Sequence, residues 1–227
     1  MFQIESYMKS LITMLRMQFA DRLLYVGLQG SYLRGEATEQ SDLDVVVILD
    51  GLTAGDLAVY RAIVESLPDP EKACGFICGK QEMANWNPLE ICNFLYGTKD
   101  YYGKIAGLLP AYTREDVINF IKLSAGNLYH ELCHRYVHGD AEKNKRALAG
   151  TYKGVFFILQ SMYYLKDGVF YLTKKELVEH LDAGDRTVME MAVKLGKAKD
   201  YDFEEAFALL LSWCQRILAE NSRICQI

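Results

Sequence analysis

The chain has 227 residues, of which 51% are hydrophobic, so it can form one large domain or two small ones with a substantial core. This composition excludes a disordered chain, and the formal net charge of −5 excludes an extended basic surface for nucleic acid. No apolar run reaches the ~18 residues of a membrane span, the first residues have the pattern of an amphipathic helix, and the six cysteines form no CxxC pair. We therefore expect a cytoplasmic protein with reduced thiols.

Hydrophobic periodicity predicts helices and strands in the first half of the chain. A helical pattern is followed by a short apolar strand that ends at a glycine-serine pair. The next apolar run, LDVVVILD, is rich in β-branched residues, which is typical of a central strand covered on both faces. The predicted helices cover residues 2–20 and 51–67, and the predicted strands cover residues 23–29, 43–50, 73–79 and 90–96.

The second half of the chain is helical almost throughout, and Leu109-Pro110 marks a domain boundary. Glycine-containing breaks separate the helices, which are predicted over residues 113–137, 141–166, 173–182, 184–196 and 203–222. We therefore expect an α+β protein with two domains. Residues 1–109 are predicted to form a mixed sheet with flanking helices, and residues 110–227 a helical bundle.

One segment carries candidate chemistry. Asp42 and Asp44 open the central strand, and side chains two apart on a strand lie on the same face, so both carboxylates face one place. Such a pair suits Mg²⁺, which prefers carboxylate, phosphate and water oxygens, and two ions are expected here. Gly30 and Ser31 let backbone N–H groups approach phosphates closely, and Arg34 adds a positive charge. The segment therefore predicts a site for Mg²⁺ and a nucleoside triphosphate.

This segment resembles the nucleotidyltransferases of the DNA polymerase β superfamily. Their motif is Gly-Ser, a spacer of about ten residues and Asp-x-Asp on a strand, which matches Gly30-Ser31 and Asp42-Leu43-Asp44. Arg34-Gly35 is common in the small members. The resemblance implies an N-terminal nucleotidyltransferase domain and an enzyme that moves a nucleoside monophosphate from an Mg²⁺-bound triphosphate to a hydroxyl group, releasing pyrophosphate.

Members of this superfamily usually have a third carboxylate, on a later strand, which binds metal or acts as the general base for the acceptor hydroxyl. The predicted strand 73–79 contains no acidic residue. Glu90, at the start of the predicted strand 90–96, takes this catalytic role by similarity, and Glu82 is the alternative. If neither contributes, the chain is expected to bind nucleotide but to transfer it poorly.

The stretch Gly150–Leu181 resembles the C-terminal domain of aminoglycoside adenylyltransferases. There a basic residue lies on one helix and a Ser/Thr-Lys pair opens the next, which assigns Lys153 and Lys174 to the triphosphate. The resemblance implies a nucleoside triphosphate, with ATP as the first choice, as the donor and a hydroxyl group as the acceptor. An aminoglycoside-like antibiotic, another small alcohol and a protein hydroxyl all remain open as the acceptor. Thr173, with Glu176 three residues later, is also predicted to cap a helix through a capping box.

Two other interpretations compete with this one. His130, Glu131 and His134 fit H-E-x-x-H, the helix motif of zinc proteases, but His138 is ~12 Å along the helix from His130 and too far to share an ion with it. A polar stripe on the helix is the preferred interpretation of these histidines.

The second alternative concerns the whole chain, which would be a non-catalytic or regulatory nucleotide-binding module, antitoxin-like, that acts through a protein partner. A third carboxylate within reach of the aspartate pair favours the enzyme.

Overall fold

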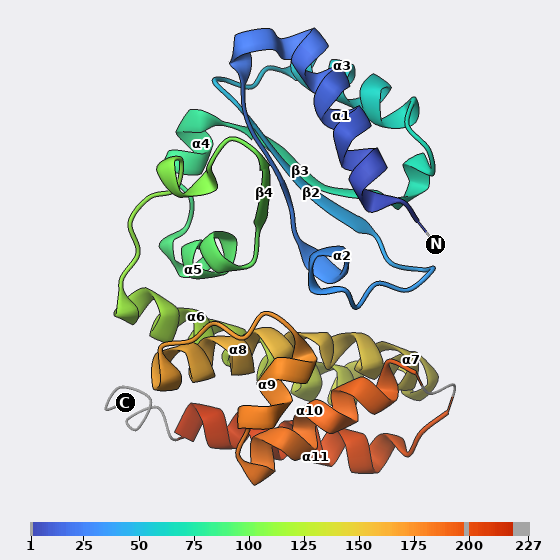
Figure 1. The fold of residues 1–227 in the computed structure, drawn as a ribbon. Coiled ribbons are helices and arrows are strands. Elements are labelled where there is room, and N and C mark those ends of the chain that lie inside the picture. Colours follow the sequence, from blue (N-terminus) through green and yellow to red (C-terminus); the bar gives the residue numbers. More distant parts are fainter. Residues whose placement is uncertain (1, 198–199, 220–227) are drawn as a thin grey trace. The chain divides into compact units, whose positions relative to one another are not determined.

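The structure, a computed structural model, describes residues 2–197 and 200–219. The chain divides after Tyr112 into two compact units, each of which has its own set of helices (Figure 1). Residues 198–199 and 220–227 of the predicted bundle, which include the last three residues of the helix predicted over 203–222, lie outside the described part of the chain.

The first unit is built around a mixed four-stranded sheet, as expected from the sequence. The strands are β1 (Leu23–Leu28), β2 (Leu43–Leu49), β3 (Ala73–Gly79) and β4 (Lys99–Tyr102), in the order β3-β2-β1-β4. β1 is antiparallel to both β2 and β4, whereas β2 and β3 are parallel. The helices are α1 (Ile4–Phe19), α2 (Gly30–Arg34), α3 (Ala54–Glu65), α4 (Lys80–Ala84) and α5 (Pro88–Tyr96).

Each face of the sheet has a separate apolar cluster. Alternate residues of β2, from Leu43 to Leu49, face the cluster that contains α1 and α3, while Val46 and Ile48 face the cluster that contains parts of α4 and α5. Figure 1 shows α1 and α3 on one side of the sheet and α4 and α5 on the other. Because both faces are covered, β2 is apolar along nearly its whole length, as its sequence predicted.

The prediction of a strand over residues 90–96 is wrong, because this segment is helix α5. Asn87 caps the helix by accepting a hydrogen bond from the Leu89 N–H at 3.1 Å, and Pro88 occupies the first helical position, where its missing N–H costs nothing. Ile91, Cys92 and Phe94 are buried on one side, a helical spacing rather than the alternation of a strand. The fourth strand is instead β4, which follows α5.

The second unit is a helical bundle. Its helices are α6 (Arg114–His138), α7 (Ala141–Thr151), α8 (Lys153–Asp167), α9 (Lys174–His180), α10 (Ala183–Leu195) and α11 (Phe203–Ala219). The single helix predicted over residues 141–166 is wrong, because α7 ends and α8 begins at Tyr152. The Tyr152 side chain is fully buried and its hydroxyl donates to the Ala206 carbonyl oxygen at 2.7 Å, so a tertiary contact fixes this junction.

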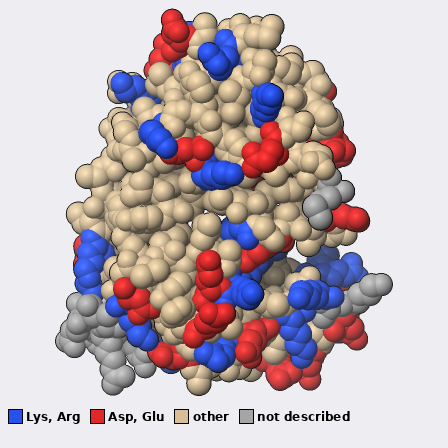
Figure 2. Space-filling view, viewed as in Figure 1, with Lys and Arg blue, Asp and Glu red and all other residues tan. Residues whose placement is uncertain are grey.

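Charged residues of both signs are interspersed on the visible face of each unit (Figure 2). Exposed pairs such as Lys145–Asp200 and Lys166–Asp182 connect neighbouring segments of the bundle. Pairs of this kind contribute little to stability, because water and salt screen them. None of the helices in the described ranges is both long enough and apolar enough to traverse a lipid bilayer.

Candidate functional site

The two aspartates lie at the N-terminal end of β2. Asp44 is the second residue of the strand, and the alternation of β2 places it and Asp42 on the face of Val46 and Ile48. Asp44 is half-buried, and burial raises the pKa of its carboxyl; the negative charge of Asp42 raises it further, while Arg34 lowers it. Two carboxylates this close together are suited to a divalent cation, so the pair fits Mg²⁺.

The glycine-serine pair is held against this carboxylate. The Gln29 N–H donates to the Asp44 carbonyl oxygen at 2.8 Å, which joins the end of β1 to the start of β2. Gly30 and Ser31 then form the first turn of α2. Gly30 has φ +69°, and a Cβ atom on it would lie 1.8 Å from the Asp44 Oδ2 atom. Glycine is therefore required here for both backbone conformation and space.

Gly30→Ala is expected to impair the site more than the fold. The new methyl group must displace the Asp44 carboxylate, and a misplacement of about 1 Å at a reacting centre can cost about 100-fold in rate. Gly35→Ala is the matched control, because Gly35 has φ +67° but nothing within 4 Å of the added carbon. In a denaturant titration the free energy of unfolding of both variants should be lower by about 1–2 kcal/mol. Only Gly30→Ala should lose Mg²⁺-dependent nucleotide binding. Equal losses of binding would contradict this assignment.

Arg34 is held beside the aspartates by an ion pair. Its Nε atom lies 3.1 Å from the Glu36 Oε2 atom, and both side chains are mostly buried. Gly35, between them, adopts the left-handed conformation that ends α2. The guanidinium charge thus reaches Asp44 from a fixed position, which the sequence alone did not specify.

Glu90 lies on the same side of the sheet as the aspartates. Its Oε2 atom accepts a hydrogen bond of 2.5 Å from the Trp86 indole, and Trp86 stacks on Phe76 of β3 with ring centroids 5.5 Å apart. Phe76 is in register with Val46, and Val46 lies two residues, or about 7 Å, after Asp44 on β2. Glu90 is exposed on the first turn of α5, so its carboxylate is accessible to a bound molecule.

Glu82 lies towards the other end of the sheet. One of its carboxylate oxygens is 2.2 Å from the position that a Cβ atom of Gly79 would take, and Gly79 is in register with Leu49. Leu49 is five residues after Asp44, about 17 Å along the strand. The placement therefore favours Glu90 over Glu82 as the third carboxylate.

The position beside Asp44 on the neighbouring strand is a cysteine. Cys74 of β3 is in register with Asp44 and is exposed. The next residue, Gly75, has φ +102°, and a Cβ atom on it would lie 2.0 Å from the Val45 carbonyl oxygen. β3 thus supplies no acid to the site, as its sequence showed, and Gly75 excludes any side chain at this point of the strand.

Two further residues near the site were not predicted from the sequence. The Gln29 side-chain amide donates to the Thr98 hydroxyl at 2.7 Å, and Thr98 directly precedes β4. Because the Gln29 backbone is bonded to Asp44, this link ties the segment between α5 and β4 to the aspartate end of the sheet. Gln29 had a visible signal, a polar residue ending an apolar run immediately before Gly30. Thr98 had none, because β4 was not predicted.

Lys153 and Lys174 both lie in the second unit, at the starts of α8 and α9. The Lys174 ammonium is 5.9 Å from the centroid of the Phe156 ring, and Phe156 is one turn after Lys153, so the two lysines lie near the same end of α8. Thr173 forms the predicted capping box with Glu176, which is confirmed.

The H-E-x-x-H motif lies on α6, and its glutamate is engaged elsewhere. Glu131 forms an ion pair with Arg135 at 2.8 Å and accepts a hydrogen bond from Thr151 at 3.3 Å. Among residues 2–197 and 200–219, no group of three or more His, Cys, Asp or Glu side chains is arranged to hold one metal ion. Both the third ligand and the free base of a zinc protease are therefore missing from this part of the chain.

Comparisons with known proteins agree with this geometry. Residues 14–82, which contain the glycine-serine pair and both aspartates, match the family model of the nucleotidyltransferase domain. No curated protein matches the sequence significantly. A solved structure of spectinomycin adenyltransferase AAD(9) from Enterococcus faecialis, with ATP and spectinomycin, has a similar fold, with a TM-score of 0.59. The match covers 95% of this chain and 99% of the other, at 16% sequence identity.

Proposed function

We propose that this chain, whose residues 14–82 are a nucleotidyltransferase domain on a polymerase β-like fold, transfers AMP from Mg²⁺-bound ATP to a hydroxyl group of a small molecule. The observation that carries the proposal is the aspartate pair packed against Gly30. The acceptor class, an aminoglycoside-like antibiotic, is supported by the fold of the spectinomycin enzyme, which extends over both units.

In this proposal the residues of the chain position the reactants. Asp42 and Asp44 would hold Mg²⁺, which when bound would neutralise phosphate charge and make the α-phosphorus more electrophilic. The N–H groups of Gly30 and Ser31 bind the outer phosphates, and Arg34 adds charge next to them. Lys153 and Lys174 are assigned to the same triphosphate by similarity to aminoglycoside adenylyltransferases.

Glu90 is proposed as the general base. Its carboxylate takes the proton of the acceptor hydroxyl, the oxygen forms a bond to the α-phosphorus, and the bond from that phosphorus to pyrophosphate breaks. The hydrogen bond from Trp86 fixes the orientation of one Glu90 oxygen and leaves the other to accept the proton. Positioning and charge neutralisation supply most of the rate enhancement.

A second candidate function is a non-catalytic nucleotide-binding module that acts through a protein partner. It is favoured by one observation: the residue in register with Asp44 on β3 is Cys74, not an acid. Both candidates predict Mg²⁺-dependent ATP binding, and only the enzyme predicts turnover.

The deciding experiment measures pyrophosphate release from ATP, GTP, CTP and UTP with and without spectinomycin, other aminoglycosides, lincosamides and protein acceptors. The enzyme is expected to release pyrophosphate with ATP only when a suitable small hydroxyl acceptor is present, and mass spectrometry should find the acceptor heavier by one AMP. ATP binding without release in any combination would support the second candidate.

The same assay tests the base. Glu90→Gln keeps an oxygen that accepts from Trp86 but cannot take a proton at neutral pH, so kcat should fall about 100- to 10,000-fold with little change in KM. Glu82→Gln, at the far end of the sheet, should be neutral. If Glu82→Gln is the slow variant, or both are fast, Glu90 is not the base.

A further inference from the structure

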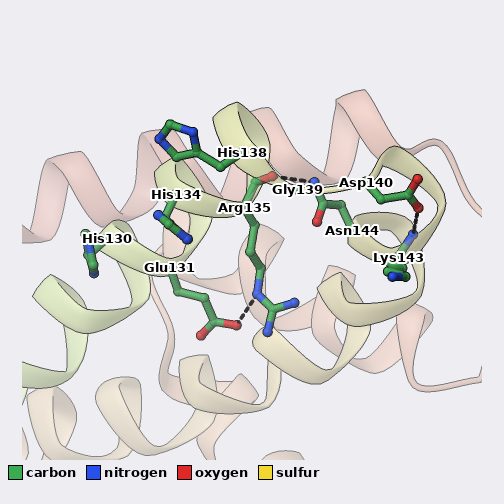
Figure 3. A pocket seen from close by; sticks show the side chains of 9 residues that line it. All are labelled: His130, Glu131, His134, Arg135, His138, Gly139, Asp140, Lys143 and Asn144. Carbon is green, nitrogen blue, oxygen red and sulfur yellow. Dashed lines mark hydrogen bonds and ion pairs between the residues drawn. The ribbon is translucent and has the colours of Figure 1, made fainter.

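Three histidines form a row along one side of α6, in the second unit. His130, His134 and His138 are spaced four residues apart, and neighbouring rings have centroids 6.0 and 5.1 Å from each other. All three are exposed. They line a pocket of about 510 Å³ together with the segment that leads into α7 (Figure 3). The proposed transfer reaction uses none of these residues.

The spacing of the rings matches a shared metal ion. Imidazole nitrogens are good ligands for Zn²⁺, Ni²⁺ and Cu²⁺, and histidines four apart on a helix are a recurring way to place two of them on one ion. A metal about 2 Å from a ring nitrogen lies about 3 Å from the ring centroid, so two rings on one ion have centroids roughly 4.5–6 Å apart. Both neighbouring pairs fall in this range.

The row offers two overlapping pairs rather than one site with three ligands. His130 and His138 are eight residues apart, about 12 Å of helix rise, so one ion reaches only two of the three rings. His134 belongs to both pairs.

The carboxylates near the row are already engaged. Glu131 points towards Arg135 in Figure 3 and is paired with it, and Asp140 accepts a hydrogen bond of 3.0 Å from the Lys143 N–H at the start of α7. An ion bound here would therefore take two nitrogens from the protein and water in its other positions, which makes an open site with exchangeable metal.

We propose that His134, with either His130 or His138, chelates one divalent transition-metal ion. The site is distinct from the Asp42–Asp44 pair in the nature of its ligands. It takes borderline metals on nitrogen, whereas the aspartates take Mg²⁺ on oxygen.

The test is a calorimetric titration of Ni²⁺ and Zn²⁺ into the untagged full chain, stripped of metal and held in excess Mg²⁺ to occupy the carboxylates. One ion per chain should bind. His134→Ala should weaken binding at least about tenfold, because both pairs share the ring of His134 and neither pair survives its removal. His130→Ala or His138→Ala alone should weaken it only about two- to threefold, since one intact pair remains.

Two controls keep the test decisive. The double variant His130→Ala/His138→Ala retains His134 but should bind as weakly as His134→Ala. His180 of α9, the one histidine of the sequence outside the row, stacks on Tyr171 with ring centroids 4.2 Å apart. His180→Ala should therefore bind like the unaltered chain. Unchanged binding by His134→Ala, with circular dichroism showing an intact fold, would overturn the proposal.

Discussion

Asp44→Asn is expected to lower the rate of pyrophosphate release by about 1,000-fold or more, while the fold is retained. The substitution keeps the shape of the side chain but removes one of two negative charges that bind the cation. Stabilisation of transition-state charge by a bound metal is worth several kcal/mol, and each 1.36 kcal/mol is a factor of ten in rate. The measurement is the acceptor-dependent release of pyrophosphate from ATP, with Mg²⁺ affinity as a second readout.

The stability of this variant gives an independent check. Burial and Asp42 raise the pKa of Asp44 above its unfolded value, so ionised Asp44 disfavours the folded state at neutral pH. Without Mg²⁺, Asp44→Asn should therefore be as stable as the unaltered chain or more stable at pH 7. Any gain should disappear as the pH falls through the carboxylate range, where Asp44 becomes protonated. Such a stability cost is common at functional sites.

Asp21→Asn is a suitable control. Asp21 is exposed and precedes β1, whose first residue, Leu23, pairs with Leu49 at the end of the sheet opposite to Asp44. It should change neither transfer nor Mg²⁺ affinity. Transfer by Asp44→Asn at the unaltered rate would end the assignment of the aspartate pair.

The part of the site that could be predicted from the sequence is the part made by one turn and two strands. Gly30 and Asp44 come together because β1 and β2 are sequential antiparallel strands, so their neighbouring ends must meet. The strong apolar pattern of β2 fixed its register and with it the face of both aspartates. Local signals were sufficient here because two consecutive strands have few alternative ways to pair.

The rest of the sheet depends on tertiary contacts that periodicity does not encode. β4 has only four residues, and it is stabilised through the Tyr25 hydroxyl, which donates to Asp100 at 2.8 Å across the sheet. Burial and this carboxylate raise the pKa of Tyr25. A short apolar run such as 90–96 fits a strand or a buried helix equally well, and Asn87-Pro88 was the signal that decides between them. Glu90 therefore lies on the first turn of a helix and not at the start of a strand.

The second prediction concerns the buried carboxylate that joins three helices of the second unit. Asp185 of α10 is 3% exposed and accepts hydrogen bonds from the Trp213 indole at 2.9 Å and the Tyr163 hydroxyl at 3.3 Å. It also forms an ion pair with Arg216 of α11. Trp213 and Tyr163 are themselves buried, so removing Asp185 takes away the acceptor of the Trp213 N–H and the Tyr163 O–H in a buried place.

Asp185→Ala is therefore expected to destabilise the chain by about 3 kcal/mol, the lower end of the range for breaking a buried ion pair, since Arg216 is partly exposed and keeps water as a partner. The melting temperature should fall by roughly 6–12 °C. Asp182→Asn is the matched control: its side chain is 74% exposed and pairs only loosely with Lys166 at 3.4 Å, so the change should stay within about 0.5 kcal/mol. A loss for Asp185→Ala no larger than for Asp182→Asn would mean that apolar packing, not this carboxylate, holds α8, α10 and α11 together.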